Sequence, residues 1–91
     1  MKLNMSEIDD VIKEIQYAEK RFGEFHSSHE GYAIIAEELD ELWDEVKKHS
    51  HDYHAEYLEA KQVACTAIRF MKMCKRLNNE VGCARTQSKS V

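Results

Sequence analysis

Apolar residues recur at steps of three and four along three stretches of the chain, a spacing that is typical of one face of an α-helix. The stretches cover about 6–22, 29–48 and 52–77. In the second stretch the apolar seam alternates between steps of four and three, at Ile35, Leu39, Leu42 and Val46. Because the second and third stretches are joined by a short connection, the pattern predicts an all-α chain of three helices, the last two forming a long antiparallel hairpin.

Residues that favour helix ends lie where the apolar pattern starts and stops. Gly23 follows the first stretch, Ser27 opens a Ser-x-x-Glu capping box before the second, and Asp52 precedes the third. Beyond the third stretch the periodic pattern is lost. We therefore expect a single helical domain over residues 1–79 and a flexible C-terminal tail over residues 80–91.

Composition narrows the fold class. Of the 91 residues, 43% are hydrophobic and 33% are charged, which is typical of a folded globular chain. The absence of proline and the presence of only three glycines disfavour an all-β domain. Three helices with wide apolar faces carry more apolar surface than one small bundle can bury. We therefore expect two chains to share a four-helix-bundle core, as a homodimer or as a dimer of such dimers.

The net charge and the cysteines of the chain indicate which binding partners and which cellular compartment to expect. The formal net charge of −4 disfavours binding to a nucleic-acid polymer, and no apolar run approaches the length of a membrane span. The chain starts without the apolar segment of a signal peptide, and its three cysteines form no Cys-x-x-Cys pair. We expect a cytoplasmic protein that keeps its cysteines reduced and binds no membrane.

An acidic pattern in the two hairpin stretches carries the candidate chemistry. Glu37, Glu38 and Glu41 form a Glu-Glu-x-x-Glu motif, and Glu59 and Gln62 lie three residues apart in the next stretch. Residues three apart share one face of a helix, so an antiparallel hairpin can turn the two pairs toward each other. Three carboxylates and one amide oxygen around a point are hard ligands that suit Mg²⁺, with Mn²⁺ as the alternative.

This combination resembles the MazG-like, all-α nucleoside triphosphate pyrophosphatase superfamily, and in particular its short members. The resemblance covers about residues 22–73. It rests on the Glu-Glu-x-x-Glu motif followed by Glu-x-x-Gln, and on the surrounding segments 29–33 and 38–47. It implies a Mg²⁺-dependent hydrolysis of a nucleoside triphosphate to its monophosphate and pyrophosphate.

The resemblance also assigns roles to residues. The metal ligands of the family correspond to Glu38, Glu41, Glu59 and Gln62. Of these, Glu38 or Glu41 would also act as the general base that positions the attacking water. Gln62 departs from the family pattern, which has aspartate at this position, so the site loses about one unit of negative charge. This departure supports an alternative function, in which a catalytically weak or inactive MazG-like helical dimer serves as a nucleotide- or protein-binding module.

Side chains outside the acidic motif are candidates for binding the nucleoside triphosphate. Trp43 can stack on a nucleobase, although a tryptophan beside an apolar seam equally suits a core or a dimer interface. Lys72, Lys75 and Arg76 can meet the triphosphate from a neighbouring helix or subunit. The other interpretation of these bases is that they interact with the negative end of their helix and with solvent.

Overall fold

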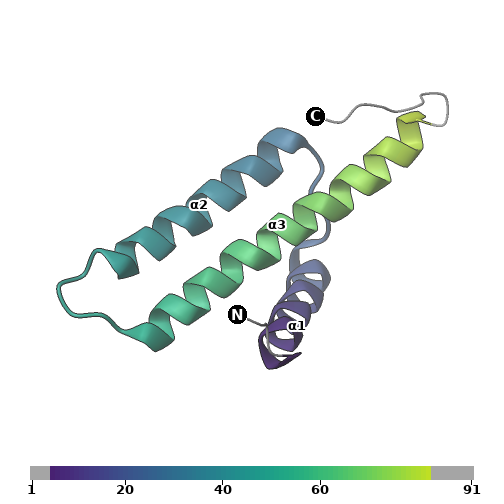
Figure 1. The fold of residues 1–91 in the computed structure, drawn as a ribbon. Helices are drawn as coiled ribbons and strands as arrows, with labels where there is room; N and C mark the ends of the chain where they lie inside the picture. Colours follow the sequence, from purple (N-terminus) through teal and green to yellow (C-terminus); the bar gives the residue numbers. More distant parts are fainter. Residues whose placement is uncertain (1–4, 83–91) are drawn as a thin grey trace.

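The computed structural model describes residues 5–82, and within that range it consists of three helices and no strand (Figure 1). The helices are α1 (Met5–Phe22), α2 (Ser28–Val46) and α3 (Tyr53–Gly82). The predicted all-α class is therefore confirmed, and α1 and α2 begin and end within two residues of the predicted positions. In this part of the chain, no helix combines the length and the apolar character that crossing a membrane requires.

α3 is longer than the apolar pattern predicts, because it ends at Gly82 rather than near residue 77. Arg76 Nε lies 3.9 Å from a carboxylate oxygen of Glu80, one turn further on, and no proline interrupts the segment. Both features favour a helix that continues without an apolar face. The predicted tail therefore starts as helix, and its remainder, 83–91, lies outside the described residues.

The helix ends have the caps that the sequence predicts. Gly23 ends α1 with a φ of +78°, and its N–H donates to the carbonyl one turn earlier at 2.9 Å. Ser27 Oγ accepts the N–H of Glu30 at 3.1 Å at the start of α2. Asp52 Oδ1 accepts the N–H of Ala55 at 3.1 Å at the start of α3. These caps fix the points at which the chain turns.

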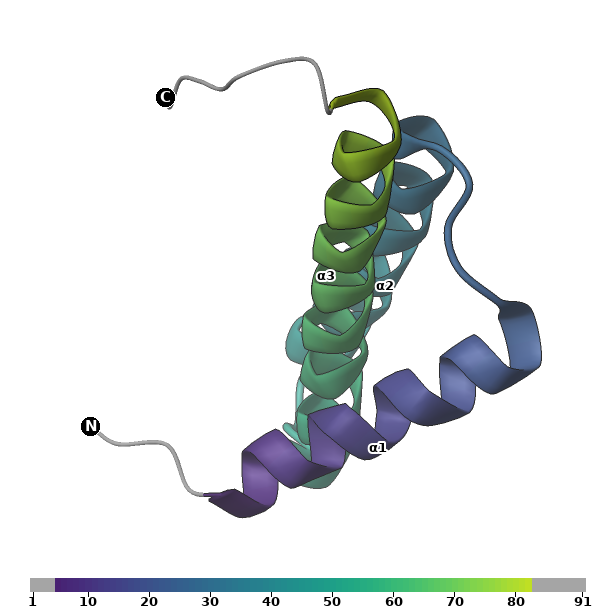
Figure 2. The ribbon, with the colours of Figure 1, turned by 90° about the vertical axis from the view of Figure 1, so that its right-hand side faces the viewer.

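α2 and α3 lie side by side and antiparallel, and α1 crosses α3 on one side of this hairpin (Figures 1 and 2). Within the described residues, the backbone of α1 comes close to α3 and not to α2. A small apolar core joins α1 to α3 and consists of Ile15, Ala18 and Cys65, with Val11 packed against it. Because this core is small, polar contacts carry much of the α1–α3 interface.

Three polar contacts flank that core. They join Asp10 to Tyr57 (2.5 Å), Glu14 to Lys61 (3.5 Å) and Glu19 to Lys72 (2.8 Å). The partners occur in the same order along both helices, so the C-terminal end of α1, which crosses α3 obliquely, lies toward the C-terminal half of α3 (Figure 2). α2 runs antiparallel to α3. α1 thus forms one wall of a groove whose other walls are the 23–27 connection, α2 and α3.

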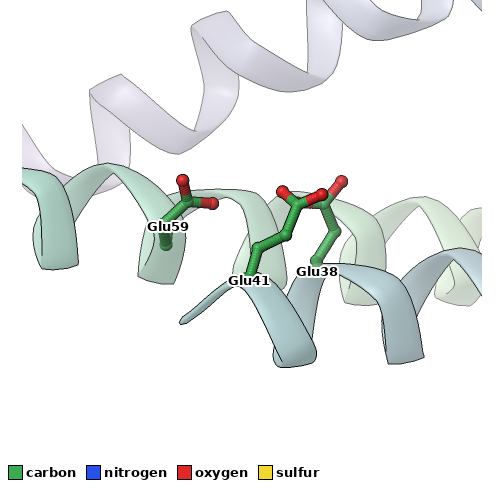
Figure 3. A group of neighbouring side chains, drawn as sticks. All are labelled: Glu38, Glu41 and Glu59. Atoms are coloured by element: carbon green, nitrogen blue, oxygen red, sulfur yellow. The ribbon is translucent and has the colours of Figure 1, made fainter. Parts of the chain in front are cut away.

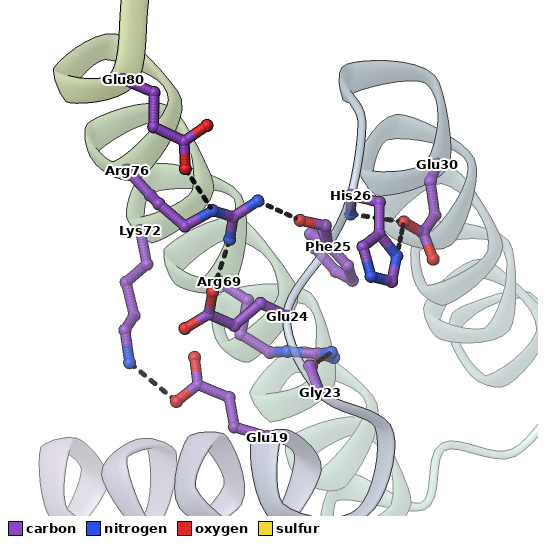
Figure 4. Close-up of polar contacts among 10 residues, drawn as sticks. All are labelled: Glu19, Gly23, Glu24, Phe25, His26, Glu30, Arg69, Lys72, Arg76 and Glu80. Carbon is purple, nitrogen blue, oxygen red and sulfur yellow. Dashed lines mark hydrogen bonds and ion pairs between the residues drawn. The ribbon is translucent and has the colours of Figure 1, made fainter.

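The connection between α1 and α2, residues 23–27, is held on α3 by two arginines (Figure 4). Phe25 is only 2% exposed, and the guanidinium carbon of Arg69 lies 4.3 Å from its ring centroid. Arg69 Nη2 donates to the Gly23 carbonyl at 3.0 Å, and Arg76 Nη2 donates to the Phe25 carbonyl at 2.8 Å. This anchoring determines where α2 begins relative to α3.

α2 packs closely against aromatic rings at Gly31. A Cβ atom at this position would lie 2.6 Å from Cδ2 of Phe70 and 3.0 Å from Cδ2 of Phe25. Both separations are shorter than ordinary van der Waals contact, so only glycine fits without a shift of the rings. The contact pairs the start of α2 with one turn of α3 and so sets the register of the hairpin.

We expect Gly31→Ala to destabilise the protein by about 1–2 kcal/mol, because the added methyl group must displace the Phe70 ring from a packed position. The opposite sign applies in an open helix, where alanine is favoured over glycine by about 1 kcal/mol. Urea denaturation followed by circular dichroism measures the difference. Adding Phe70→Leu should recover most of the loss. A single variant more stable than the wild type would show that the rings are not in the way.

Candidate metal centre

Three carboxylates converge between the two arms of the hairpin. Glu38 and Glu41, one turn apart on α2, meet Glu59 of α3, as Figure 3 shows. Each side chain offers one oxygen, and these three oxygens all lie within 4.8 Å of one another. The carboxylates come from two helices, so their approach is a property of the tertiary structure rather than of one acidic helix face.

The register of the hairpin produces this convergence. Gly31 of α2 lies against Phe70 of α3. Ten residues forward along α2 and eleven residues backward along α3 from that pair reach Glu41 and Glu59, at nearly the same level of the hairpin. Glu38 is one turn before Glu41 on the same face and therefore reaches the same point. A turn of either helix by one residue position, about 100°, would rotate the facing pairs apart.

Among the three carboxyl groups of the cluster, Glu38 has the most strongly raised pKa. Burial, followed by the charges of Glu41, Glu59 and Glu37 and hydrogen bonding with Glu41, raises the pKa of Glu38 to about 7. Its Oε1 atom is buried and has no hydrogen-bond partner among the described residues. Burial and the Glu41 charge also raise the pKa of Glu59. The cluster therefore concentrates negative charge at a place where carboxylates are costly to ionise.

This donor set fits a small divalent cation. Mg²⁺ takes oxygen ligands at about 2.0–2.1 Å, so two oxygens on opposite sides of the ion are about 4.2 Å apart. The observed spread of up to 4.8 Å is wider by less than 1 Å, which side-chain rotation can close. A cation would also offset the mutual repulsion and give the buried Glu38 Oε1 atom a partner. Glu41 is the exposed member of the cluster, so the centre is open to water on one side.

A groove of about 410 Å³ lies beside the cluster, bordered by α1, the 23–27 connection and the hairpin. Glu38 and Gln62 line it, and Thr66 and Arg69 line it further along α3. The seven residues from Gln62 to Arg69 rise about 10 Å and return to nearly the same face of the helix. The groove therefore extends from the acidic cluster toward the anchored connection.

Of the other candidate residues, Gln62 lies beside the cluster and Trp43 does not. Gln62 is half-buried and lines the groove with Glu38, which is compatible with a role as fourth ligand. Trp43 is 58% exposed and lies about 200° around α2 from Glu41, so it points away from the cluster of its own chain. Within one chain, Trp43 is therefore not in a position to contact a ligand at these carboxylates.

Lys72 and Arg76 pair with acidic residues of α1 and of the 23–27 connection, away from the cluster (Figure 4). Lys72 Nζ lies 2.8 Å from Glu19, and Arg76 Nη1 lies 2.5 Å from Glu24. They follow Glu59 by 13 and 17 residues, or about 20 and 25 Å along α3. In this chain both bases stabilise the docking of α1 and its connection, at a distance from the acidic cluster.

Arg69 is a groove residue that the sequence analysis missed. Only 7% of it is exposed, and its Nε atom is buried without a hydrogen-bond partner among the described residues. The available signal was its position two helical turns after Gln62, which places both side chains on one face of α3. Charge alone does not distinguish Arg69 from Lys72, Lys75 and Arg76, which follow it on the same helix.

Comparison of the chain with protein-family models, with curated proteins and with solved structures found no match. The case for a function therefore rests on the geometry of the cluster and the groove and on the spacing of the acidic motifs. Both lead to the same residues, Glu38, Glu41 and Glu59.

We expect the metal-free protein to lose stability as the pH rises from about 5 to about 7. The pKa of Glu38 is about 7 in the folded state and 4.5 as its ordinary value, so between these values the folded state binds more protons than the unfolded state. After screening by water on the open side of the cluster, the loss should amount to about 1–2 kcal/mol.

Urea denaturation in EDTA at both pH values, compared with Glu38→Gln, isolates this contribution from other titrating groups. The variant should show a smaller loss than the wild type. Asp40→Asn is the matched control, because Asp40 is exposed on α2 outside the cluster and should keep the wild-type pH dependence. An equal slope in the wild type and in Glu38→Gln would contradict the assignment.

Proposed function

We propose that the protein is a Mg²⁺-dependent nucleoside triphosphate pyrophosphohydrolase, with Mn²⁺ as an alternative metal. The observation that carries the proposal is the meeting of Glu38, Glu41 and Glu59, from two helices, beside a groove large enough for a nucleotide's phosphate chain. The Glu-Glu-x-x-Glu and Glu-x-x-Gln spacing, which resembles that of MazG-like enzymes, supports the same reaction.

The proposed chemistry divides between the cation and the carboxylates. A divalent cation would neutralise phosphate oxygens and make a nearby water more acidic. Glu38, Glu41 and Glu59 would hold it, and the amide oxygen of Gln62 would complete the set. The exposure of Glu41 favours it over Glu38 as the carboxylate that positions the attacking water and accepts its proton. One water is consumed as the bond between the α- and β-phosphates breaks.

Gln62 is the residue that favours the second candidate function, a catalytically weak or inactive binding module. A neutral amide oxygen attracts Mg²⁺ less than a carboxylate does, so the centre would hold its cation more weakly. The scaffold would then still bind a nucleotide or a protein through the groove. Activity measurements on the natural chain and on Gln62→Asp separate the two functions.

We expect the wild type to release pyrophosphate from at least one nucleoside triphosphate with Mg²⁺ or Mn²⁺, and Gln62→Asp to lower the metal concentration needed for half-maximal rate by about tenfold or more. The reason is the added carboxylate beside Glu38. A coupled pyrophosphate assay over the common and modified nucleotides measures both quantities.

Glu41→Gln provides the control, since it removes one ligand charge and should abolish turnover. Thermal melts in EDTA and in Mg²⁺ report metal binding separately, and a hundredfold excess of Mg²⁺ over its dissociation constant should stabilise the wild type by about 2–3 kcal/mol. A folded wild type without turnover of any nucleotide would refute the enzymatic function. Melts unaffected by Mg²⁺ or Mn²⁺ would refute the metal centre.

A homodimer is the second part of the proposal, supported by apolar side chains that the single chain leaves exposed. α2 buries only Gly31 fully, and the side chain of Leu39 is 54% exposed. The exposed apolar face of α2 comprises Tyr32, Leu39, Trp43 and Val46. These residues lie about 140–200° around the helix from Glu41, so a partner packed on them would leave the carboxylates accessible. Two hairpins packed in this way would give the expected four-helix core, and a dimer of dimers stays a prediction.

We expect sedimentation equilibrium at micromolar concentration to give the mass of two chains for the wild type and of one chain for Leu39→Lys. The substituted charge cannot be buried against a second apolar face at an acceptable cost. Tyr17→Lys is the matched control, because Tyr17 is an exposed aromatic residue of α1, outside this face, and should leave the dimer intact. A monomeric wild type would contradict the shared core.

A further inference from the structure

Arg69 is a buried cation for which the described residues provide no opposite charge. It is more than nine-tenths buried, and no carboxylate of the described chain forms an ion pair with it. Buried charges in proteins are normally paired, because leaving water is costly unless an opposite charge or several hydrogen bonds compensate. Its lack of a counter-charge therefore needs an explanation.

The contacts within the chain use little of its hydrogen-bonding capacity. One nitrogen, Nη2, donates to the Gly23 carbonyl at 3.0 Å, and the guanidinium stacks over Phe25. An arginine has five N–H donors, so most are left over, and Nε is buried without a partner. Anchoring the 23–27 connection thus accounts for only part of what this side chain offers.

Three of the carboxylates that line the groove, on α1, the connection and α2, already have other partners. Glu24 pairs with Arg76, and Glu30 accepts the backbone N–H of His26 at 2.6 Å. Glu14, which lines the groove from α1, lies 3.5 Å from Lys61. Glu37 and Glu38 also line the groove, but neither forms an ion pair with Arg69. Arg69 therefore lines the groove wall without a counter-charge, about 10 Å along α3 from Gln62.

We propose that Arg69 binds a phosphate group of the ligand whose metal-bound end lies at Glu38, Glu41 and Glu59. The inference rests on the proposed function and names a second anchor for the same substrate class. A triphosphate chain with its cation is long enough to reach from the cluster toward Arg69. A guanidinium forms paired, charge-assisted hydrogen bonds with phosphate oxygens, so the ligand would supply the missing counter-charge.

The experiment titrates two Mg²⁺-loaded probes, inorganic pyrophosphate and a nucleoside triphosphate with a methylene group between its α- and β-phosphorus atoms. Calorimetry gives dissociation constants for the wild type, Arg69→Lys, Arg69→Met and Lys13→Met. Arg69→Met should raise the dissociation constants of both probes by at least about tenfold. Arg69→Lys should raise them by less, because lysine keeps the positive charge but lacks the paired N–H donors of the guanidinium. Affinity for Mg²⁺ alone should change by less than about twofold.

Lys13→Met is the matched control, since it removes an exposed cation of α1 that does not line the groove, and it should bind both probes like the wild type. A second readout does not depend on any variant folding. The Nε–H resonance of Arg69 in the ¹⁵N-labelled wild type should shift as either probe saturates the protein. A purely structural Arg69 would leave this resonance where it is.

The outcomes separate this inference from the proposed function. Turnover by the wild type, with unchanged probe affinity in Arg69→Met, would overturn the role of Arg69 alone. Arg69-dependent binding of pyrophosphate without turnover of any nucleotide would support the anion anchor and refute the enzyme. An Arg69 resonance that does not respond, or a wild type that binds neither probe, would overturn the inference.

Discussion

The close packing of Gly31 against Phe70 and Phe25 is the contact on which the candidate site depends. It fixes which turn of α3 lies opposite the start of α2, and the rest of the hairpin follows because both helices have the same rise per residue. The meeting of Glu41 with Glu59, far along the hairpin, is the result. A site of charged side chains, which repel one another, is thus held together by an uncharged contact.

Local features of the sequence were enough to predict much of this arrangement. The helices follow from apolar spacing, and their ends from Gly23, Ser27 and Asp52, which act on neighbouring backbone groups. The approach of the acidic pairs needs only one further condition, an antiparallel hairpin with a short turn. With that topology, residues at fixed steps along both arms face each other, so spacing along the chain is enough to place the carboxylates.

What depends on contacts between distant segments could not be predicted in the same way. The burial of Arg69 and the pairing of Lys72 with Glu19 require the position of α1, which periodicity does not give. Arg69, Lys72 and Arg76 of α3 look alike in the sequence. All three hold α1 or its connection in place, yet of these three only Arg69 also lines the groove. The last turn of α3 has no apolar face to detect, and an ion pair between Arg76 and Glu80 supports it instead.

Because of the way α1 is attached, the groove wall on α1 and the carboxylate cluster in the hairpin differ in their sensitivity to salt concentration. α1 is joined to α3 by a small core and by pairs such as Glu14 with Lys61 and Glu19 with Lys72, whose attraction mobile ions screen at physiological ionic strength. The hairpin relies on packed rings that ions do not affect. We therefore expect rising ionic strength to weaken the attachment of α1, and with it one wall of the groove, before it disturbs the packing that brings the carboxylates together.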